Sequence, residues 1–255
     1  MKIQYTVHCT AGRIRLENED NFYLNGEIRD LENREVKKEG SFEGDHALFA
    51  VCDGLGGEGN GEKASYAAVT MLEPFRDDFC RRSMEYFVDA NQEMHSLQRS
   101  SQSGMDCTFT GLYLSGSGYY GCNLGDSRLY LLRDQQFTQL SEDHSEFAAM
   151  LRYGVFKPED YYTSNARNRL TRSVGCLKET LVPREVSGEN LLAGDIFLLC
   201  SDGLCGYVHD EEMSDILNKD MELTDMADEL VGRALIYRSD DNITVMIIRI
   251  QEEGQ

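Results

Sequence analysis

The chain has 255 residues, of which 41% are hydrophobic, so it is long enough to bury a sizeable core. Its 45 acidic and 25 basic residues give a formal net charge of −20, which argues against nucleic acid or an anionic membrane as a partner. Since the N-terminus shows no leader pattern and no stretch approaches the ~20 apolar residues of a membrane span, we expect a cytoplasmic protein.

The first half of the chain predicts strands, then helices, then a hairpin. Apolar and β-branched patterns predict strands at 2–9, 21–24 and 47–54, whereas the polar segment 26–44 suggests an exposed loop or hairpin, to which we assign no function. Helical spacing runs over 60–79, with a break expected at Pro74, and again over 84–99. The turn at 116–118 joins strands at 107–114 and 119–125, and 127–133 is a further strand.

The second half predicts a helix at 142–153, an aromatic and polar flap at 154–168, and an apolar strand ending in Asp202-Gly203. A helix from Thr224, as N-cap, to about 238 and a strand at 243–250 follow. Strands and helices come in groups and do not alternate strictly, so the fold class is α+β, an antiparallel sheet pair flanked by helices. With no linker or repeat, we expect a single domain over 1–255.

Four acidic clusters lie at the edges of apolar runs. They are Glu19-Asp20, Asp53-Gly54, Asp202-Gly203 and Asp241-Asn242. Any one Asp-Gly is commonly just a turn, but four such clusters indicate carboxylates that converge on one point. The eight cysteines form no CxxC pair and the five histidines form no ligand pattern, so the candidate metal ligands are oxygen atoms. Oxygen ligands suit Mg²⁺ or Mn²⁺ better than Zn²⁺.

The chemistry that such a site favours is phosphoryl transfer. Two cations bridged by one carboxylate lower the pKa of a bound water and hold both oxygens of an in-line displacement. Asp53 suits the bridging position, because Gly54 can turn its carbonyl toward the same ion. Arg15, four residues before Glu19, offers a planar fork for a phosphate dianion.

The chain resembles the metal-dependent serine/threonine protein phosphatases of type 2C in their bacterial form, over nearly its whole length. The resemblance lies in a series of motifs in order: RLENED (15–20), FAVCDGLGGEGNGEKAS (49–65), CTFTGLYL (107–114), NLGDSRLYLL (123–132), RLTRSVG (169–175), FLLCSDGL (197–204) and DDNITVMII (240–248). It implies a central β-sandwich with helices outside, a four-layer αββα fold.

The resemblance also implies a two-metal site with Mn²⁺ or Mg²⁺. Asp53 would bridge both ions, the Gly54 carbonyl would complete one of them, and Asp202 and Asp241 would hold the other. Asp20, with Glu19 behind it, would act through metal-bound waters. Arg15 would grip the phosphate while a metal-bridging water or hydroxide attacks phosphorus, without a phosphoenzyme.

Two positions depart from the family pattern. Leu55 stands where eukaryotic members carry a histidine that protonates the leaving oxygen, so a metal-bound water would have to donate that proton. Gly206 stands where many members have an acidic ligand for a third metal that Asp126 would share. We therefore expect Asp126 to hold a third ion weakly or not at all.

Two alternatives remain open. The spacing Cys122-x5-Arg128 is that of cysteine-based phosphatases, although Gly121 replaces the usual histidine and the segment lies between strands. A pseudophosphatase that only binds would require the loss of a core carboxylate, and all four are present. The expected partners are phosphorylated proteins and a cognate serine/threonine kinase in signalling, and we expect a monomer.

Overall fold

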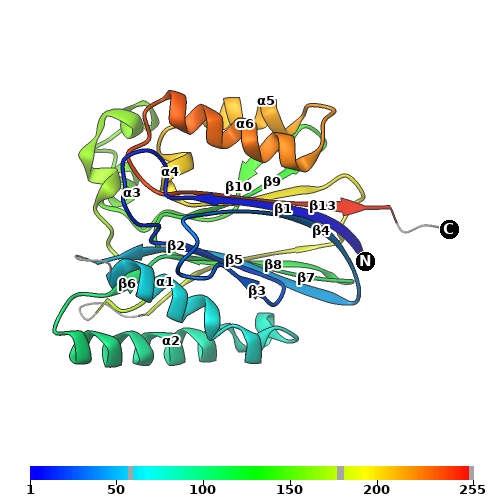
Figure 1. The fold of residues 1–255 in the computed structure, drawn as a ribbon. Helices are drawn as coiled ribbons and strands as arrows, with labels where there is room; N and C mark the ends of the chain where they lie inside the picture. The colour runs from blue at the N-terminus through cyan, green and yellow to red at the C-terminus, as the bar shows by residue number, and fades with distance from the viewer. Residues whose placement is uncertain (57–59, 177–180, 253–255) are drawn as a thin grey trace.

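Two antiparallel β-sheets pack face to face, and helices cover both outer faces (Figure 1). The computed structural model describes residues 1–56, 60–176 and 181–252, so positions 57–59 of the motif at 49–65 lie outside the described residues. Every strand pair in the two sheets is antiparallel. The predicted α+β sandwich, with the layer order αββα, is confirmed.

The strands of each sheet come from distant parts of the sequence. The first sheet has the order β10-β9-β12-β13-β1-β4, with β1 (Lys2–Thr10), β4 (Glu35–Glu43), β9 (Arg128–Arg133), β10 (Gln136–Gln139), β12 (Ile196–Cys200) and β13 (Ile243–Gln251). The second has the order β11-β8-β7-β5-β2-β3, with β2 (Asp20–Leu24), β3 (Glu27–Ile28), β5 (His46–Leu55), β7 (Phe109–Ser115), β8 (Gly118–Leu124) and β11 (Arg184–Glu189). A short strand, β6 (Asp106–Cys107), pairs with the end of β5.

Helices form the two outer layers and one end of the molecule. In Figure 1, α1 (Asn60–Thr70) and α2 (Phe79–Ser101) lie below the second sheet, while α5 (Asp210–Leu217) and α6 (Leu223–Ile236) lie above the first. The end opposite the two termini holds α3 (Glu146–Arg152) and α4 (Asp202–Cys205). Three 3₁₀ turns complete the set: η1 (Glu73–Phe75), η2 (Pro158–Thr163) and η3 (Asn165–Asn168). Across the described ranges, no helix combines the length and the apolar character that a membrane crossing needs.

The long apolar runs of the sequence arise because central strands are covered on both faces. In β12, Phe197 and Leu199 point into the core between the sheets, whereas Leu198 and Cys200 point into the core beneath α5 and α6. All four side chains are fully buried. A strand that is buried on both faces shows no polar alternation, which explains the continuous hydrophobic pattern.

Four sequence expectations need correction. The segment 26–44 is not a simple loop, because it contains β4, whose alternating exposure shows an edge strand with one open face. The helix expected over 60–79 ends at Thr70, and Pro74 lies in η1, where its fixed φ is tolerated. The last helix begins at Leu223 with Glu222 in the N-cap position, so Thr224 is already helical. Similarly, α3 starts later than expected, after Ser145, whose side chain accepts from the Ala148 amide.

Candidate metal centre

The pairing of β2 with β5 places Asp20 directly opposite Asp53. Asp20 is fully buried, and its Oδ2 accepts hydrogen bonds of 2.7 Å from Thr244, in β13 of the other sheet, and from Ser201, which directly follows β12 of that sheet. The backbone of Asp53 is fixed by Thr108, whose Oγ1 accepts from the Asp53 amide at 2.9 Å. The two carboxylates therefore meet at the end of the sandwich, between the sheets.

Asp202 and Asp241 come from the ends of another pair of adjacent strands. Asp202 begins α4 two residues after β12, and Asp241 lies two residues before β13, which pairs with β12. The Asn242 side chain joins this region to the first acidic cluster, because its Oδ1 accepts from the Glu19 amide at 2.8 Å. All four acidic clusters of the sequence thus gather at one end of the fold.

The Glu19 carboxylate lies against the beginning of α1. It accepts a hydrogen bond from the Gly61 backbone, and a Cβ at Gly61 would come within 2.7 Å of its Oε1. Gly54 lies equally close, since a Cβ there would meet the Gly61 carbonyl at 1.9 Å. Only glycine fits at this junction of β5, the Glu19 loop and α1.

Burial and mutual repulsion raise the pKa of the carboxyl groups of Asp53, Asp20 and Asp202. The pKa of Asp53 lies well above its usual range because of desolvation first, and then because of the charges of Asp20, Asp202, Asp241 and Asp126. Desolvation and neighbouring aspartates, opposed by hydrogen bonds from Ser201 and Thr244, raise the pKa of Asp20 to about 7. Desolvation and Asp241 raise that of Asp202 to about 6, even though Asp202 shares a hydrogen bond with Asp53. The cluster therefore favours cations or protons.

The donor set fits hard divalent cations. The Oδ1 atoms of Asp20 and Asp202 are buried and have no hydrogen-bond donor, which is costly unless a cation or water takes that place. Across the described residues, no three His, Cys, Asp or Glu side chains already stand in a closed ligand arrangement. Asp241 instead forms a 2.9 Å ion pair with the Arg15 guanidinium, and desolvation together with the charge of Asp241 raises the pKa of Asp202 to about 6. Carboxylate and carbonyl oxygens are the ligands that Mg²⁺ and Mn²⁺ prefer.

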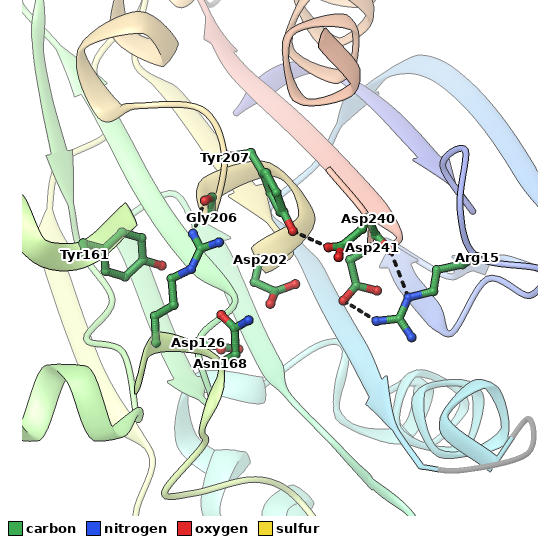
Figure 2. Close-up of a pocket in the computed structure, with 10 residues that line it drawn as sticks. Arg15, Asp126, Tyr161, Asn168, Asp202, Gly206, Tyr207, Asp240 and Asp241 are labelled. Carbon is green, nitrogen blue, oxygen red and sulfur yellow. Dashed lines mark hydrogen bonds and ion pairs between the residues drawn. The ribbon is translucent and has the colours of Figure 1, made fainter. Parts of the chain in front are cut away.

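Arg15 borders a polar pocket of about 130 Å³ that also contains Asp126, Asp202 and Asp241 (Figure 2). Its guanidinium donates to Asp241 Oδ2 at 2.9 Å and to the Asp240 carbonyl at 3.1 Å. Its side chain remains 48% exposed. The sequence placed Arg15 beside Glu19, whereas the structure places its charge on Asp241, which is 226 residues away in the chain.

The pocket also contains residues of the predicted flap and of the motif at 240–248 to which the sequence pattern assigned no individual role. Arg167, in η3, donates to the Gly206 carbonyl, and its guanidinium lies 5.3 Å from the Tyr207 ring centroid. Tyr161, Asn168 and Asp240 complete the lining. A Cβ at Gly206 would stand 3.1 Å from the Arg167 guanidinium. The Arg167 side chain therefore lies beside the position at which many members of the resembled family have an acidic residue.

His144 supports the turn that carries Asp126. Its Nδ1 accepts from the Gly125 amide at 3.1 Å, and its own amide donates to the Gly125 carbonyl at 2.8 Å. Desolvation and the charge of Arg172 lower the pKa of His144 to about 4, so the ring stays neutral and can accept. The contacts of this histidine are structural, and a role as catalytic base is not supported.

The cysteine-based alternative does not fit the structure. Cys122 lies within β8, is 3% exposed, and has a pKa well above the usual thiol value because of desolvation first and then the charge of Glu185. Arg128 is held by Asp143 through a 2.7 Å ion pair and by Tyr130 at 3.0 Å. A nucleophilic cysteine needs a lowered pKa and an accessible phosphate cradle, and Cys122 has neither.

A buried arginine in the segment to which we assigned no function positions the first acidic cluster. Arg29 is 1% exposed and donates to the carbonyls of Asn18 at 2.6 Å, Asp20 at 2.9 Å and Asn33 at 2.8 Å. A lysine keeps the charge but cannot reach three carbonyls in one plane. We expect Arg29→Lys to lower the free energy of unfolding by about 2–4 kcal/mol, measured by urea denaturation.

The exposed Arg81 provides the matched control for this substitution. Arg81→Lys should change the unfolding free energy by less than about 0.5 kcal/mol, as surface replacements usually do. If both lysine variants had the same denaturation midpoint as the parent protein, Arg29 would not organise this loop.

Comparison with known proteins places these features in context. The sequence model of a family described as protein phosphatase 2C matches residues 39–232. The serine/threonine phosphatase Stp of Listeria monocytogenes is 31% identical over 248 residues, which cover 93% of this chain and 92% of that protein. The crystal structure of the Mycobacterium tuberculosis serine/threonine phosphatase PstP/Ppp superposes with a TM-score of 0.84 and 27% identity, covering 99% of this chain and 100% of that one. A structure of the PstP catalytic domain in complex with two manganese ions has a TM-score of 0.82 and 26% identity over 99% of this chain and 100% of that chain.

Proposed function

Because this chain belongs to the protein phosphatase 2C family, we propose that it hydrolyses phosphoserine and phosphothreonine in proteins with the help of two Mn²⁺ or Mg²⁺ ions. One observation carries the proposal: carboxylates from four distant segments meet at one end of the sandwich, and two of their buried oxygens lack a donor. A set of oxygen donors with this much repulsion is stable only with strong counter-charge.

The proposed ligand roles follow the positions of the carboxylates. Asp53, whose charge interacts with those of Asp20, Asp202, Asp241 and Asp126, would be the ligand shared by the two ions, and the Gly54 carbonyl would complete one of them. Asp202 and Asp241 would hold the second ion. Asp20, with Glu19, lies behind them and orients bound water, because its Oδ2 is already held by two hydroxyl groups. Asp126 borders the same pocket and is at most a weak ligand for a third ion.

When bound, the two ions supply a low-pKa water as nucleophile and neutralise charge on the phosphate. The chain itself supplies orientation. Arg15 is exposed enough to turn, and its present partner Asp241 is also a proposed ligand. If Asp241 bound a metal ion instead of Arg15, the planar Arg15 guanidinium would be free to bind two phosphate oxygens. It would then hold the ester in line for attack. No covalent phosphoenzyme is required, because the ions would supply the nucleophilic water and the described pocket lining contains no cysteine, serine or histidine.

We also propose the finer features that the sequence suggested. The chain acts in the cytoplasm as a monomeric, single catalytic domain over 1–255, in bacterial signalling that a serine/threonine kinase opposes. The flap at 154–168 borders the pocket through Tyr161 and Arg167, which supports a role at the mouth of the site. A pseudophosphatase remains the second candidate, and only Gly206 favours it.

Metal removal tests the proposal directly. We expect hydrolysis of p-nitrophenyl phosphate and of a phosphothreonine peptide with Mn²⁺ to fall to background with a chelator and to return when Mn²⁺ is added back, because the nucleophile requires the ions. Cys122→Ser should retain full activity, since Cys122 is buried in β8. Activity that survives chelation and is lost in Cys122→Ser would overturn the metal mechanism. No turnover of either substrate with Mn²⁺ would favour the pseudophosphatase.

A further inference from the structure

A second hollow adjoins the pocket of the metal centre. It has a volume of about 790 Å³ and lies between α3, η2 and the beginning of α5; we call it the flap groove. Tyr161 lines both the flap groove and the metal-centre pocket, so the two hollows are neighbours on either side of this residue. The flap groove is several times larger than the pocket and large enough to take several side chains of an extended peptide.

The floor of the flap groove is aromatic and fixed. The Phe147 ring packs edge-on against Tyr161, with centroids 5.3 Å apart, and Tyr161 packs in the same way on Tyr162 at 5.0 Å. Tyr162 in turn lies 3.9 Å from the His209 ring. These contacts tie η2 to both α3 and the beginning of α5, so the floor is formed before any ligand binds.

The rim of the flap groove is acidic. Glu159 and Glu211 are exposed lining residues, and neither has a cationic side chain within ion-pair distance in the part of the chain that the structure describes. The basic lining residues, by contrast, are already paired: Arg128 with the buried Asp143 and Arg152 with Glu142 at 3.2 Å. The Tyr161 ring already carries the Arg128 guanidinium at 4.6 Å, so it is the two unpaired carboxylates that suit a cationic side chain, above all that of arginine.

We propose that the flap groove binds the part of a phosphoprotein that flanks the phosphorylated residue, and that it selects flanking segments with basic side chains. The inference rests on the proposed phosphatase function and names its substrate class. The phosphorylated residue enters the metal-centre pocket, and the neighbouring residues run past Tyr161 into the flap groove. Acidic flanking segments are disfavoured, because they would meet Glu159 and Glu211 across the same floor.

The test compares two phosphothreonine peptides of the same length, one with arginines and the other with glutamates around the phosphothreonine. We expect kcat/KM with Mn²⁺ to be at least tenfold higher for the basic peptide and this ratio to fall as ionic strength rises. In the double variant Glu159→Gln/Glu211→Gln the ratio should fall about three- to tenfold, mainly through KM for the basic peptide. Moving one arginine through successive positions will locate the preferred offset from the phosphothreonine.

The net charge of −20 could favour basic peptides at any surface, so the variant needs a matched control. Glu43 in β4 and Glu189 in β11 are exposed carboxylates at the strand ends remote from the site. In the strand register they lie opposite Lys2 and Gly118. Glu43→Gln/Glu189→Gln should leave the ratio unchanged. Equal ratios in the two double variants would overturn the proposal. Hydrolysis of p-nitrophenyl phosphate, too small to reach the flap groove, should be the same in all three proteins; its absence in the parent would instead refute the phosphatase function.

Discussion

Asp53→Asn should lower kcat for p-nitrophenyl phosphate with saturating Mn²⁺ by about a thousandfold or more. Asparagine has the same shape and keeps a carbonyl acceptor, but it cannot bridge two cations with a negative charge. The carboxyl of Asp53 lies amid four other aspartates, so its loss removes the shared anion of the proposed site. Calorimetric titration of the variant with Mn²⁺ should show weaker binding than in the parent protein. If the substitution affected only the rate of the reaction, Mn²⁺ binding would be unchanged.

Asp126→Ala is the matched comparison for this loss. Asp126 borders the same pocket, but the Gly206 position beside it offers no carboxylate, and Arg167 occupies its surroundings. We therefore expect Asp126→Ala to reduce kcat by much less than Asp53→Asn does. Equal losses in two folded variants would show that a third ion is required. If Asp53→Asn kept more than a tenth of the parent kcat, the bridging role would be wrong.

The sequence predicts the metal centre better than it predicts what surrounds that centre. Each core carboxylate lies in or within two residues of a strand, and a strand that is covered on both faces leaves a clear hydrophobic pattern. The antiparallel pairing then fixes which carboxylates meet, as for Asp20 and Asp53. Carboxylates that converge from strand ends can therefore be recognised from local patterns, whereas their individual ligand roles remain predictions.

Residues whose roles depend on tertiary contacts could not be found in this way. Arg29 looks like one more charge in a polar segment, yet it is almost fully buried among backbone carbonyls. Arg167 lies in an aperiodic segment, and nothing local indicates that it reaches Gly206. Edge strands such as β4 and β11 also escape a hydrophobic pattern, because one face of each is open to solvent.

The same carboxylates that form the site should destabilise the protein when no metal is bound. Asp20 is fully buried, and its pKa is raised from 3.8 to about 7 in the folded state. A carboxyl group whose folded pKa exceeds its unfolded pKa binds its proton more tightly in the folded state, so stability is lost as pH rises from about 4 to about 7. Asp202, with a pKa of about 6, acts in the same direction. The chelated protein should therefore melt at a lower temperature at pH 8 than at pH 5.

Asp20→Asn should remove part of this destabilisation. The asparagine carbonyl can accept the same hydrogen bonds from Ser201 and Thr244, while the buried charge disappears. At pH 8 with chelator we expect the variant to unfold about 5 °C above the parent, as a gain of roughly 2 kcal/mol implies for a chain of this size. At pH 5 the difference should vanish, because the parent is then already protonated at Asp20. Saturating Mn²⁺ should reverse the order, since the parent gains more from binding.

Asp195 provides the control in which the same substitution should have the opposite sign. It is 2% exposed, but Arg133 binds it in a bidentate fashion, at 2.7 Å to Oδ1 and 2.5 Å to Oδ2. Neutralising a buried carboxylate that has its cation leaves the arginine unpaired, so Asp195→Asn should lower the unfolding temperature at pH 8 with or without Mn²⁺. Asp195 has a fixed cation and is expected to stabilise the fold, whereas Asp20 has none and is expected to destabilise it in the absence of metal. If thermal unfolding showed both asparagine variants destabilised in chelator, the unpaired charge of Asp20 would not be the cause.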